Sequence, residues 1–371
     1  MPKPPKTPID LEELLEYVAH EQTVMLRAAP GLSFQGCRLA KAVFMVCDLA
    51  GCDFRGADLS GATFAQCDLP DTVFTGALLT GTTFVDCNMV RADFRDCEFM
   101  LTQLVKSNAE EALLQGTAID QSTFAMTDLS QADLSDVTVS RAALLDCPIE
   151  GITLGGAVLS NFMLTKADLR NVDISGTHID TALFSDADLS GKDLAGQSLQ
   201  RCTFHQGVFK GTKLDSAQLN GSVFAECDFV HATMTGLSAN STAFVKSRLD
   251  GVDLSGSAFN MANFAGSSLV GAKLVGSQAY SSVFLEADCR AALFERCDLR
   301  QAEMSHADLS GANLSAATFQ NTKLHAAKRD GTLFLGVAGS VIDTNQDQAI
   351  AELYSPHVVA LDQEEPERRA R

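Results

Sequence analysis

The sequence predicts an all-β solenoid, a quadrilateral β-helix of about 15 four-sided coils with an N-terminal capping α-helix. Two observations predict this fold class. From Phe34 to Leu324 every fifth residue is apolar, which gives 59 consecutive positions without an insertion, and phenylalanine recurs within this series at a spacing of 20 residues. Neither the helical period of about 3.6 residues nor the strand period of about 2 places apolar residues in this way over such a length.

Each unit of the repeat has five positions. A small residue lies two positions before the large apolar residue, as Ala57 does before Leu59, and a polar residue separates them. Residues two apart on an extended chain point to the same side, so we expect both the small and the large side chain to point inward. Glycine, aspartate and serine fill many of the remaining positions and suit corners and the outer surface. The inward series is weakest at Ala109, Ala239, Ala279 and Cys289.

Phenylalanine indicates how many sides each coil has. It occupies 10 of the 15 positions that are spaced by 20 residues between residues 44 and 324. A preference that returns at every fourth unit indicates four sides, with like residues stacked above one another. Parallel coils stack roughly 4.8 Å apart, which predicts a rod about 70 Å long. The phenylalanines of this series are Phe44, Phe64, Phe84, Phe124, Phe184, Phe204, Phe224, Phe244, Phe264 and Phe284.

Several units carry a family signature. The segments ADLSG at residues 57–61 and 187–191 and ADLSGANLS at residues 307–315 resemble the A(D/N)LXX unit of the pentapeptide repeat family. The resemblance extends over about 300 of the 371 residues. It implies a right-handed quadrilateral β-helix, and it is far less specific about function than about fold.

Both ends of such a stack expose an apolar cross-section, which needs a cover. Residues 1–30 supply an amphipathic helix that either caps the stack or docks a partner. We expect Thr7 to be its N-cap residue, Pro8 its first residue and Asp10 its third. The predicted apolar stripe consists of Leu11, Leu14, Leu15 and Val18.

The remaining chain divides into two parts. Residues 31–337 form the predicted β-helix, and residues 338–371 form a C-terminal cap followed by a disordered charged tail. The cap is expected in the stretch QDQAIAELYS from residue 346, and the tail in LDQEEPERRAR from residue 361. High charge and few apolar side chains disfavour a packed structure in that tail.

Two stretches inside the repeat depart from its pattern. At residues 98–114 apolar residues take outward positions, which predicts a bulged coil or an exposed interaction patch. At residues 189–199 polar residues take the small inward position in successive units. Since a buried lysine without a partner is costly, we expect a locally twisted coil that lets both side chains reach solvent, with a ligand site as the alternative. The residues concerned are Met100, Leu101, Val105 and Leu113 in the first stretch and Lys192 and Gln197 in the second.

The reactive residue types do not come together in this pattern. Ten of the eleven cysteines take the small inward position and Cys289 takes the large one, where a thiol acts as a small apolar group. Five histidines of the repeat fall on outward positions, which excludes a Cys/His zinc site or a Cys–His nucleophile pair within the rod. No nucleotide-binding or hydrolase motif is present. We therefore predict no catalytic residue, no cofactor and no metal site. The histidines are His178, His205, His231, His306 and His325.

Composition limits the environment of the protein. The net charge of −19 disfavours binding to nucleic acid or anionic lipid. The N-terminus lacks the apolar core of a signal peptide, and no apolar run is long enough to cross a bilayer, so we expect no membrane insertion. An odd number of cysteines in a long chain fits a reducing compartment. We expect a bacterial cytoplasmic protein, with export without a cleaved signal as the alternative.

Two non-enzymatic functions compete, and both depend on protein partners. The first is a rigid scaffold or adaptor, since long uninterrupted arrays with a short N-terminal helix resemble accessory or effector-associated proteins of bacterial type VI secretion systems. The second is an acidic DNA mimic that binds a type II topoisomerase (gyrase), as the resemblance to the quinolone-resistance proteins of the family implies. A homodimer through an end coil or through the N-terminal helix is compatible with either function.

The DNA-mimic hypothesis depends on a row of acidic residues at one outward position. Over residues 32–337 the chain has 35 acidic and 22 basic residues, a net charge of −13. B-DNA carries about one charge per 1.7 Å, or roughly 40 over the length of the rod, so the magnitude of the charge favours the scaffold. The predicted acidic stripe consists of Asp48, Asp68, Asp128, Asp168, Asp188, Asp228, Asp288 and Asp308.

Overall fold

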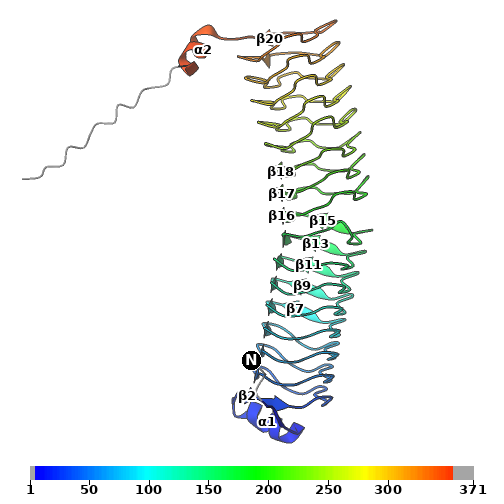
Figure 1. Ribbon diagram of the computed structural model, residues 1–371, viewed down its shortest axis with the longest axis vertical. Coiled ribbons are helices and arrows are strands. Elements are labelled where there is room, and N and C mark those ends of the chain that lie inside the picture. Colours follow the sequence, from blue (N-terminus) through cyan, green and yellow to red (C-terminus); the bar gives the residue numbers. More distant parts are fainter. Residues whose placement is uncertain (1–4, 354–371) are drawn as a thin grey trace, which may run out of the picture.

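The computed structural model describes residues 5–353, and these form one long four-sided β-solenoid (Figure 1). Successive coils pair in parallel with a register of 20 residues, so that Phe44 pairs with Phe64 and Phe64 with Phe84. The same register holds on the other sides, where Asp53 bridges Val73 and Asp58 bridges Leu78. The fold class predicted from the repeat is therefore confirmed.

Two sides of the solenoid are regular enough to form sheets. One side is an 11-stranded parallel sheet from β2 near the N-terminal end to β18, and the adjacent side is a 5-stranded parallel sheet over the middle coils. The remaining positions pair through single bridges. The first sheet contains β2 (Val24–Met25), β4 (Val43–Met45), β5 (Thr63–Ala65), β6 (Thr83–Val85), β8 (Gln103–Val105), β10 (Thr123–Ala125), β12 (Ala143–Leu145), β14 (Met163–Thr165), β16 (Leu183–Ser185), β17 (Thr203–His205) and β18 (Val223–Ala225), and the second contains β7 (Glu98–Met100), β9 (Ala118–Asp120), β11 (Thr138–Ser140), β13 (Val158–Ser160) and β15 (His178–Asp180).

Two ladders of stacked phenylalanine rings fill much of the interior. Within the predicted ladder, the ring centroids of Phe44 and Phe64 are 4.8 Å apart and those of Phe64 and Phe84 are 5.0 Å apart. A second ladder comes from the opposite side, where the rings of Phe54 and Phe74 stack at 5.2 Å. The two ladders meet edge to face, with Phe54 and Phe64 at an interplanar angle of 84°. The predicted stacking of like residues is confirmed, and both ring arrangements are favourable for aromatic pairs.

The corners of the coils place one residue in the left-handed backbone region. Gly51 has a φ of 64° and Met126, with its side chain exposed, has a φ of 51°. Glycine adopts this conformation without a steric penalty, which explains why it is common two positions after the large apolar residue. Other residue types at this position carry some backbone strain.

This strain gives a testable prediction at Thr181, a β-branched residue with a φ of 54° and an exposed side chain. Asparagine tolerates the left-handed region better than threonine, so we expect Thr181→Asn to raise the free energy of unfolding by roughly 0.5–1 kcal/mol. Chemical denaturation measures the change. The matched control is Thr138→Asn in strand β11, an exposed threonine without positive φ, where the same substitution should give no gain. An equal gain at both sites would contradict the strain argument.

The predicted N-terminal helix is present as α1 (Leu11–Ala19) and covers the first coil. Leu14 is fully buried, and the other members of the predicted apolar stripe pack partly buried against the core. The apolar stripe is thus confirmed, and its contacts show α1 closing the N-terminal cross-section of the rod.

The predicted start of this helix was wrong. Asp10 is the N-cap residue, and its side chain accepts a hydrogen bond of 2.9 Å from the backbone N–H of Glu13. Thr7 and Pro8 instead form strand β1 (Thr7–Pro8), which pairs with β3 (Arg27–Ala28). The backbone N–H of Thr7 donates to the carbonyl of Leu26 at 2.9 Å, so pairing within the first coil decides this segment's conformation.

The stack is longer than the predicted 15 coils. At the N-terminal end, β1 pairs with β3, which lies 20 residues further along the chain. At the other end, β19 (Thr322–Lys323) pairs with β20 (Val341–Ile342). From residue 7 to residue 342 this amounts to about 17 turns. The first turn was missed because α1 interrupts the five-residue pattern between β1 and β2.

The C-terminal end is not covered in the predicted way. Helix α2 (Gln346–Leu353) forms within the stretch expected to be the cap, but it lies beside the last coils instead of across the end (Figure 1). Leu333, Leu335 and Ile342 of the last coil remain 48%, 71% and 49% exposed. The predicted disordered tail from residue 361 lies outside the described residues. Neither described helix has the length and hydropathy needed to cross a membrane.

Candidate functional site

The cysteines line the interior, as predicted from their positions within the five-residue unit. Ten of them are buried and Cys37 is half-buried. Their thiols donate to carbonyls of the preceding coil, as Cys47 Sγ does to Val24 O at 3.1 Å and Cys52 Sγ to Ala29 O at 3.0 Å. Burial raises the pKa of the Cys52 thiol to about 12. A thiol that stays protonated is neither a nucleophile nor a metal ligand at neutral pH.

The predicted acidic stripe lies on one side of the rod. Asp48 bridges Asp68, and Asp168 bridges Asp188, so neighbouring carboxylates are separated by a single coil spacing. Seven of the eight aspartates also have a local structural role: Asp48 Oδ1 accepts the backbone N–H of Ala50 at 3.2 Å. The same contact, two residues along the chain, recurs at Asp128, Asp168, Asp188, Asp228, Asp288 and Asp308.

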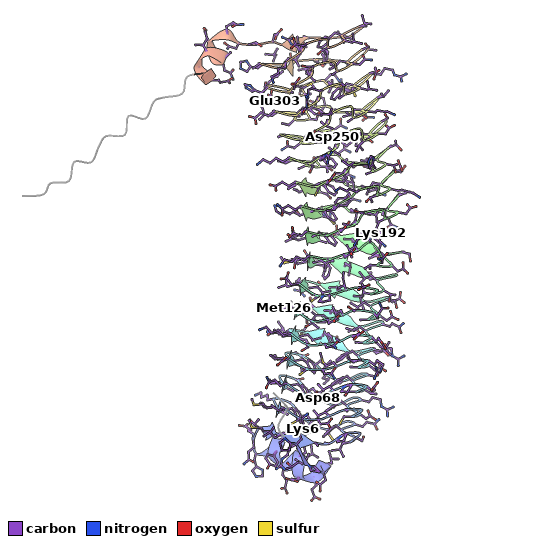
Figure 2. All side chains as sticks on the ribbon, in the orientation of Figure 1. Lys6, Asp68, Met126, Lys192, Asp250 and Glu303 are labelled. Carbon is purple, nitrogen blue, oxygen red and sulfur yellow. The ribbon has the colours of Figure 1, made fainter. Side chains whose placement is uncertain are left out.

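Basic side chains neutralise most of this stripe. Lys6 Nζ lies 2.6 Å from a carboxylate oxygen of Asp68, because the N-terminal segment runs beside the first coils (Figure 2). Arg170 pairs with both Asp168 and Asp188. Three further pairs bring the number of aspartates with a basic partner to six of eight, namely Asp228 with Lys210, Asp288 with Arg290 and Asp308 with Lys328. The stripe therefore presents much less negative charge than its sequence predicts.

The apolar residues of 98–114 do not gather into one patch. Met100 and Leu101 are 43% and 51% exposed at one corner, whereas Val105 and Leu113 are half-buried on two opposite sides. The register runs through this stretch without an inserted residue, since β7 pairs with β9 and β8 with β10. The predicted bulge is absent here, and the exposed apolar surface is limited to the corner.

Lys192 breaks the regular ladder on its side of the rod. Its Nζ donates a hydrogen bond to the carbonyl of Val172 at 2.5 Å. In the regular register, that carbonyl would instead accept a hydrogen bond from the backbone N–H of Asp193. Burial lowers the pKa of the Lys192 ammonium, although Asp173 and Asp168 act in the opposite direction. Lys192 and Gln197 are both half-buried, so the predicted exit to solvent is only partial. Figure 2 shows Lys192 near the middle of the rod.

A second break lies on the side of the acidic stripe and was not predicted. Elsewhere at this position the residue donates its N–H to the preceding coil, as Asp128 does to Ser107 O at 2.9 Å, and Pro148 has no N–H to donate. The missing N–H removes a bond to the preceding coil, and a second gap lies toward the following coil: within the described chain, no backbone hydrogen bond joins residues 147–151 to residues 167–171. A proline at a polar position of the repeat was the sequence signal for an irregular coil. A groove of about 380 Å³ at this place is lined by Ser130, Cys147, Pro148, Ile149, Glu150, Gly151, Lys166, Asp168, Arg170 and Asn171.

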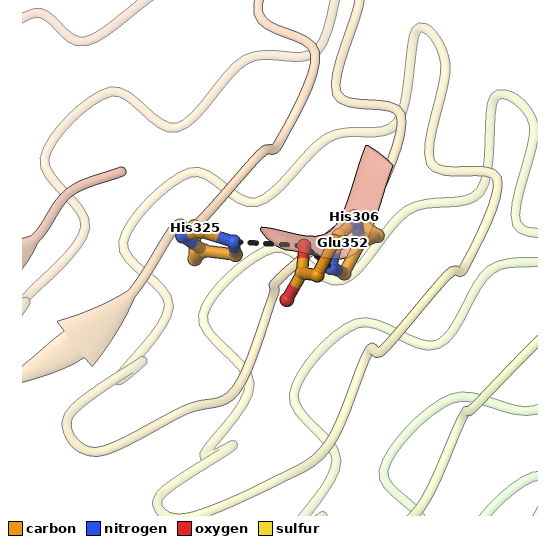
Figure 3. Close-up of side chains that lie close together, drawn as sticks. All are labelled: His306, His325 and Glu352. Carbon is orange, nitrogen blue, oxygen red and sulfur yellow. Dashed lines mark hydrogen bonds and ion pairs between the residues drawn. The ribbon is translucent and has the colours of Figure 1, made fainter. Parts of the chain in front are cut away.

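The remaining cluster lies at the C-terminal end, where α2 meets the last coils (Figure 3). His306 Nε2 and His325 Nε2 lie 3.3 Å and 3.1 Å from the same carboxylate oxygen of Glu352. Although His325 has the predicted outward position, it is only 7% exposed because residues 344–352 cover it. Repeat phase alone could not reveal this contact, since Glu352 lies beyond the repeat.

Comparison with known families agrees with the repeat pattern. The family model described as "Pentapeptide repeat region" matches residues 47–124, and the model described as "Pentapeptide repeats (8 copies)" matches residues 208–238, 247–285 and 287–326. Together these matches cover about half of the chain. The comparison with curated proteins gives no match.

Among solved structures, the similar chains include HetL and Rfr23, each described as a pentapeptide repeat protein. QnrB1, a plasmid-mediated fluoroquinolone resistance protein, is 21% identical over 48% of this chain and 90% of its own, with a TM-score of 0.35. HetL, involved in heterocyst differentiation regulation in the cyanobacterium Nostoc, is 19% identical over 83% of this chain and 96% of its own, with a TM-score of 0.20. Rfr23 from the cyanobacterium Cyanothece is 16% identical over 38% of this chain and 89% of its own, with a TM-score of 0.19.

Proposed function

Because this chain belongs to the pentapeptide repeat family, whose repeats build a sealed apolar interior and leave the outer faces for contacts, we propose that it is a non-enzymatic scaffold or adaptor that binds protein partners. The observation that carries the proposal is the groove at Pro148. It interrupts the hydrogen bonding between coils and leaves backbone groups of two coils without their usual coil-to-coil partners.

The rim of this groove is polar and charged. Lys166 and Arg170 lie on one coil and Glu150 on the other. The two cations form ion pairs of 2.7 Å with Asp146 and 2.6 Å with Asp168, both largely open to solvent. Exposed pairs of this kind contribute little to stability, so a partner can exchange them at low cost. Polar side chains or backbone groups of a protein partner fit this surface better than an apolar ligand does.

The finer part of the proposal concerns the pathway. We place the protein in the bacterial cytoplasm, as an accessory or effector-associated component of a secretion system. The reason is that long uninterrupted arrays with an N-terminal helix resemble proteins of type VI secretion systems. The exposed apolar residues of the last coil support pairing of two copies through that end.

A capture experiment tests the scaffold and its contact site. A tagged full-length chain should retain a specific partner from the source bacterium, and Arg170→Glu should reduce that retention at least tenfold. The matched control is Arg290→Glu, because Arg290 pairs with Asp288 at the same position of a coil without the groove. Equal retention by the two variants would exclude the groove as the contact, and the absence of any specific partner would contradict the scaffold.

The acidic DNA mimic stays the alternative, since it depends on a partner that the fold does not specify. The neutralised stripe disfavours it: six of its eight aspartates pair with Lys or Arg. We therefore expect no inhibition of DNA supercoiling by purified gyrase at submicromolar protein. Potent inhibition in that range would overturn the scaffold in favour of the DNA mimic.

A further inference from the structure

Three potential metal ligands converge where α2 lies against the last coils. His306 and His325 come from successive coils and Glu352 from α2, and their ligand atoms all lie within 4.8 Å of one another (Figure 3). We propose that this cluster binds one divalent transition-metal ion, with Zn²⁺ as the representative ion, and that the ion fastens α2 to the side of the rod. This inference revises the sequence-based prediction that the chain has no metal site.

The two His–Glu distances fit a tetrahedral ion. Ligands at about 2.0–2.2 Å from zinc lie roughly 3.3 Å apart in tetrahedral geometry. The two His–Glu distances, 3.3 Å from His306 and 3.1 Å from His325, are close to that value. The imidazole rings meet at 78° with centroids 5.4 Å apart, so they approach the shared carboxylate from different directions. Two imidazoles and one carboxylate leave a fourth position for water, and imidazole ligands favour zinc, copper or nickel over magnesium or calcium.

The surroundings make the cluster both sheltered and reachable. The side chain of His325 is 9% exposed, whereas those of His306 and Glu352 are 36% and 37% exposed. An ion can therefore enter from the solvent side without a rearrangement of the coils. Partial burial also strengthens the interaction between the ion and the carboxylate relative to a fully exposed site.

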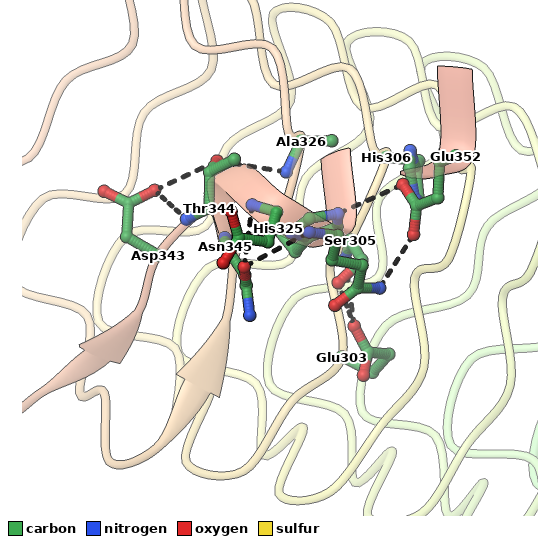
Figure 4. A network of polar contacts seen from close by, with 11 residues as sticks. Glu303, Ser305, His306, His325, Ala326, Asp343, Thr344, Asn345 and Glu352 are labelled. Carbon is green, nitrogen blue, oxygen red and sulfur yellow. Dashed lines mark hydrogen bonds and ion pairs between the residues drawn. The ribbon is translucent and has the colours of Figure 1, made fainter. Parts of the chain in front are cut away.

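Helix α2 has few other contacts that hold it in place. It has eight residues, fewer than an isolated helix needs for stability in water, and residues 346–352 are all half-buried or exposed; Ile350 is 67% exposed. Just before it, Asn345 donates its backbone N–H to His325 Nδ1 at 3.2 Å, and Thr344 accepts from the N–H of Ala326 (Figure 4). A metal bond to Glu352 supplies the anchor that apolar packing does not.

The metal-free network sets a limit on affinity. Since His325 Nδ1 accepts a hydrogen bond from Asn345, the neutral ring carries its proton on Nε2 and donates it to Glu352. Because a neutral imidazole has only one N-bound proton, an ion at Nε2 requires the other tautomer, in which that proton is on Nδ1 and faces the N–H of Asn345. One hydrogen bond is thereby lost, at a cost of roughly tenfold in affinity. We expect micromolar binding, with a small shift of Asn345 away from Nδ1.

Calorimetric titration of the full-length chain with ZnCl₂, after treatment with a chelator, tests the site. The expected result is one equivalent bound with a micromolar Kd, weakened at least tenfold by His306→Ala and by Glu352→Gln. His231→Ala is the matched control, because His231 is another exposed corner histidine (φ 63°, against 59° for His306) and lies far from Glu352 in the stack. MgCl₂ at the same concentrations should give no binding.

A second readout separates the ion's effect on α2 from a general loss of fold. Zinc should slow hydrogen exchange of the α2 amides in the wild-type chain and leave it unchanged in the Glu352→Gln variant. That exposed substitution is not expected to unfold the coils, which far-UV circular dichroism checks. Absence of saturable zinc binding, binding that survives either substitution at the cluster, or equal binding of Mg²⁺ would overturn the proposal.

Discussion

Phe64→Asp is expected to unfold the coils around it, whereas Cys67→Ala should leave thermal stability nearly unchanged. The ring of Phe64 stacks between Phe44 and Phe84 at 4.8 Å and 5.0 Å and is fully buried. Removing a buried phenylalanine side chain costs about 3–5 kcal/mol, and an unpaired carboxylate in an apolar interior adds a further penalty.

The control lies three residues away in the same coil. Cys67 is also buried, and its Sγ donates weak hydrogen bonds of 3.4 Å and 3.5 Å to the carbonyls of Ala65 and Phe44. Alanine fills the same small inward position elsewhere in the repeat, so we expect a change of about 1 kcal/mol or less. Thermal denaturation followed by circular dichroism measures both variants. Similar melting temperatures for the two would show that Phe64 does not point inward.

The second large effect concerns the thiols. In the native protein at pH 8, we expect Ellman's reagent to modify Cys37 rapidly and the other ten cysteines slowly or not at all. Burial raises the pKa of Cys147 and of Cys202 to about 11, so about one thiol in a thousand is ionised at this pH. Because a raised pKa keeps the thiol neutral below that value, protection should persist up to about pH 10 as long as the chain stays folded.

Three comparisons make this result specific. Unfolding in guanidinium chloride should expose all eleven thiols, and Cys37→Ser should remove the rapid phase from the native chain. Several rapidly reacting thiols in the folded protein would contradict the inward assignment of the cysteines. The experiment also bears on the absence of thiol chemistry, because a reactive or metal-binding cysteine needs access and an ionised sulfur.

The repeat made much of the fold predictable from the sequence. Each coil contacts mainly its two neighbours, so a residue's phase within the five-residue unit fixes whether it points inward or outward. Phase correctly placed the phenylalanine ladders and the inward cysteines. The spacing of 20 residues gave the four-sided register.

Phase was a poor guide wherever a contact depends on residues outside the unit. Thr7 and Pro8 looked like the start of a helix, but they pair with Arg27 and Ala28 because α1 fits within one register of 20 residues. The stripe of aspartates looked strongly acidic, but Lys6 reaches Asp68 from a segment 62 residues earlier in the chain. The groove at Pro148 and the insertion of Lys192 between coils follow from hydrogen bonds that a single unit does not specify.

The sequence by itself determined the architecture of this protein, its four sides and its apolar interior, because those properties repeat and need only local contacts. Only the tertiary structure decided which outer features come together. His325 has an outward position in the repeat and is nevertheless buried, since α2 returns along the side of the rod and brings Glu352 to it. The physical reason is that the interior is fixed by a pattern copied from coil to coil, whereas the outer surface is shaped by single contacts between distant segments.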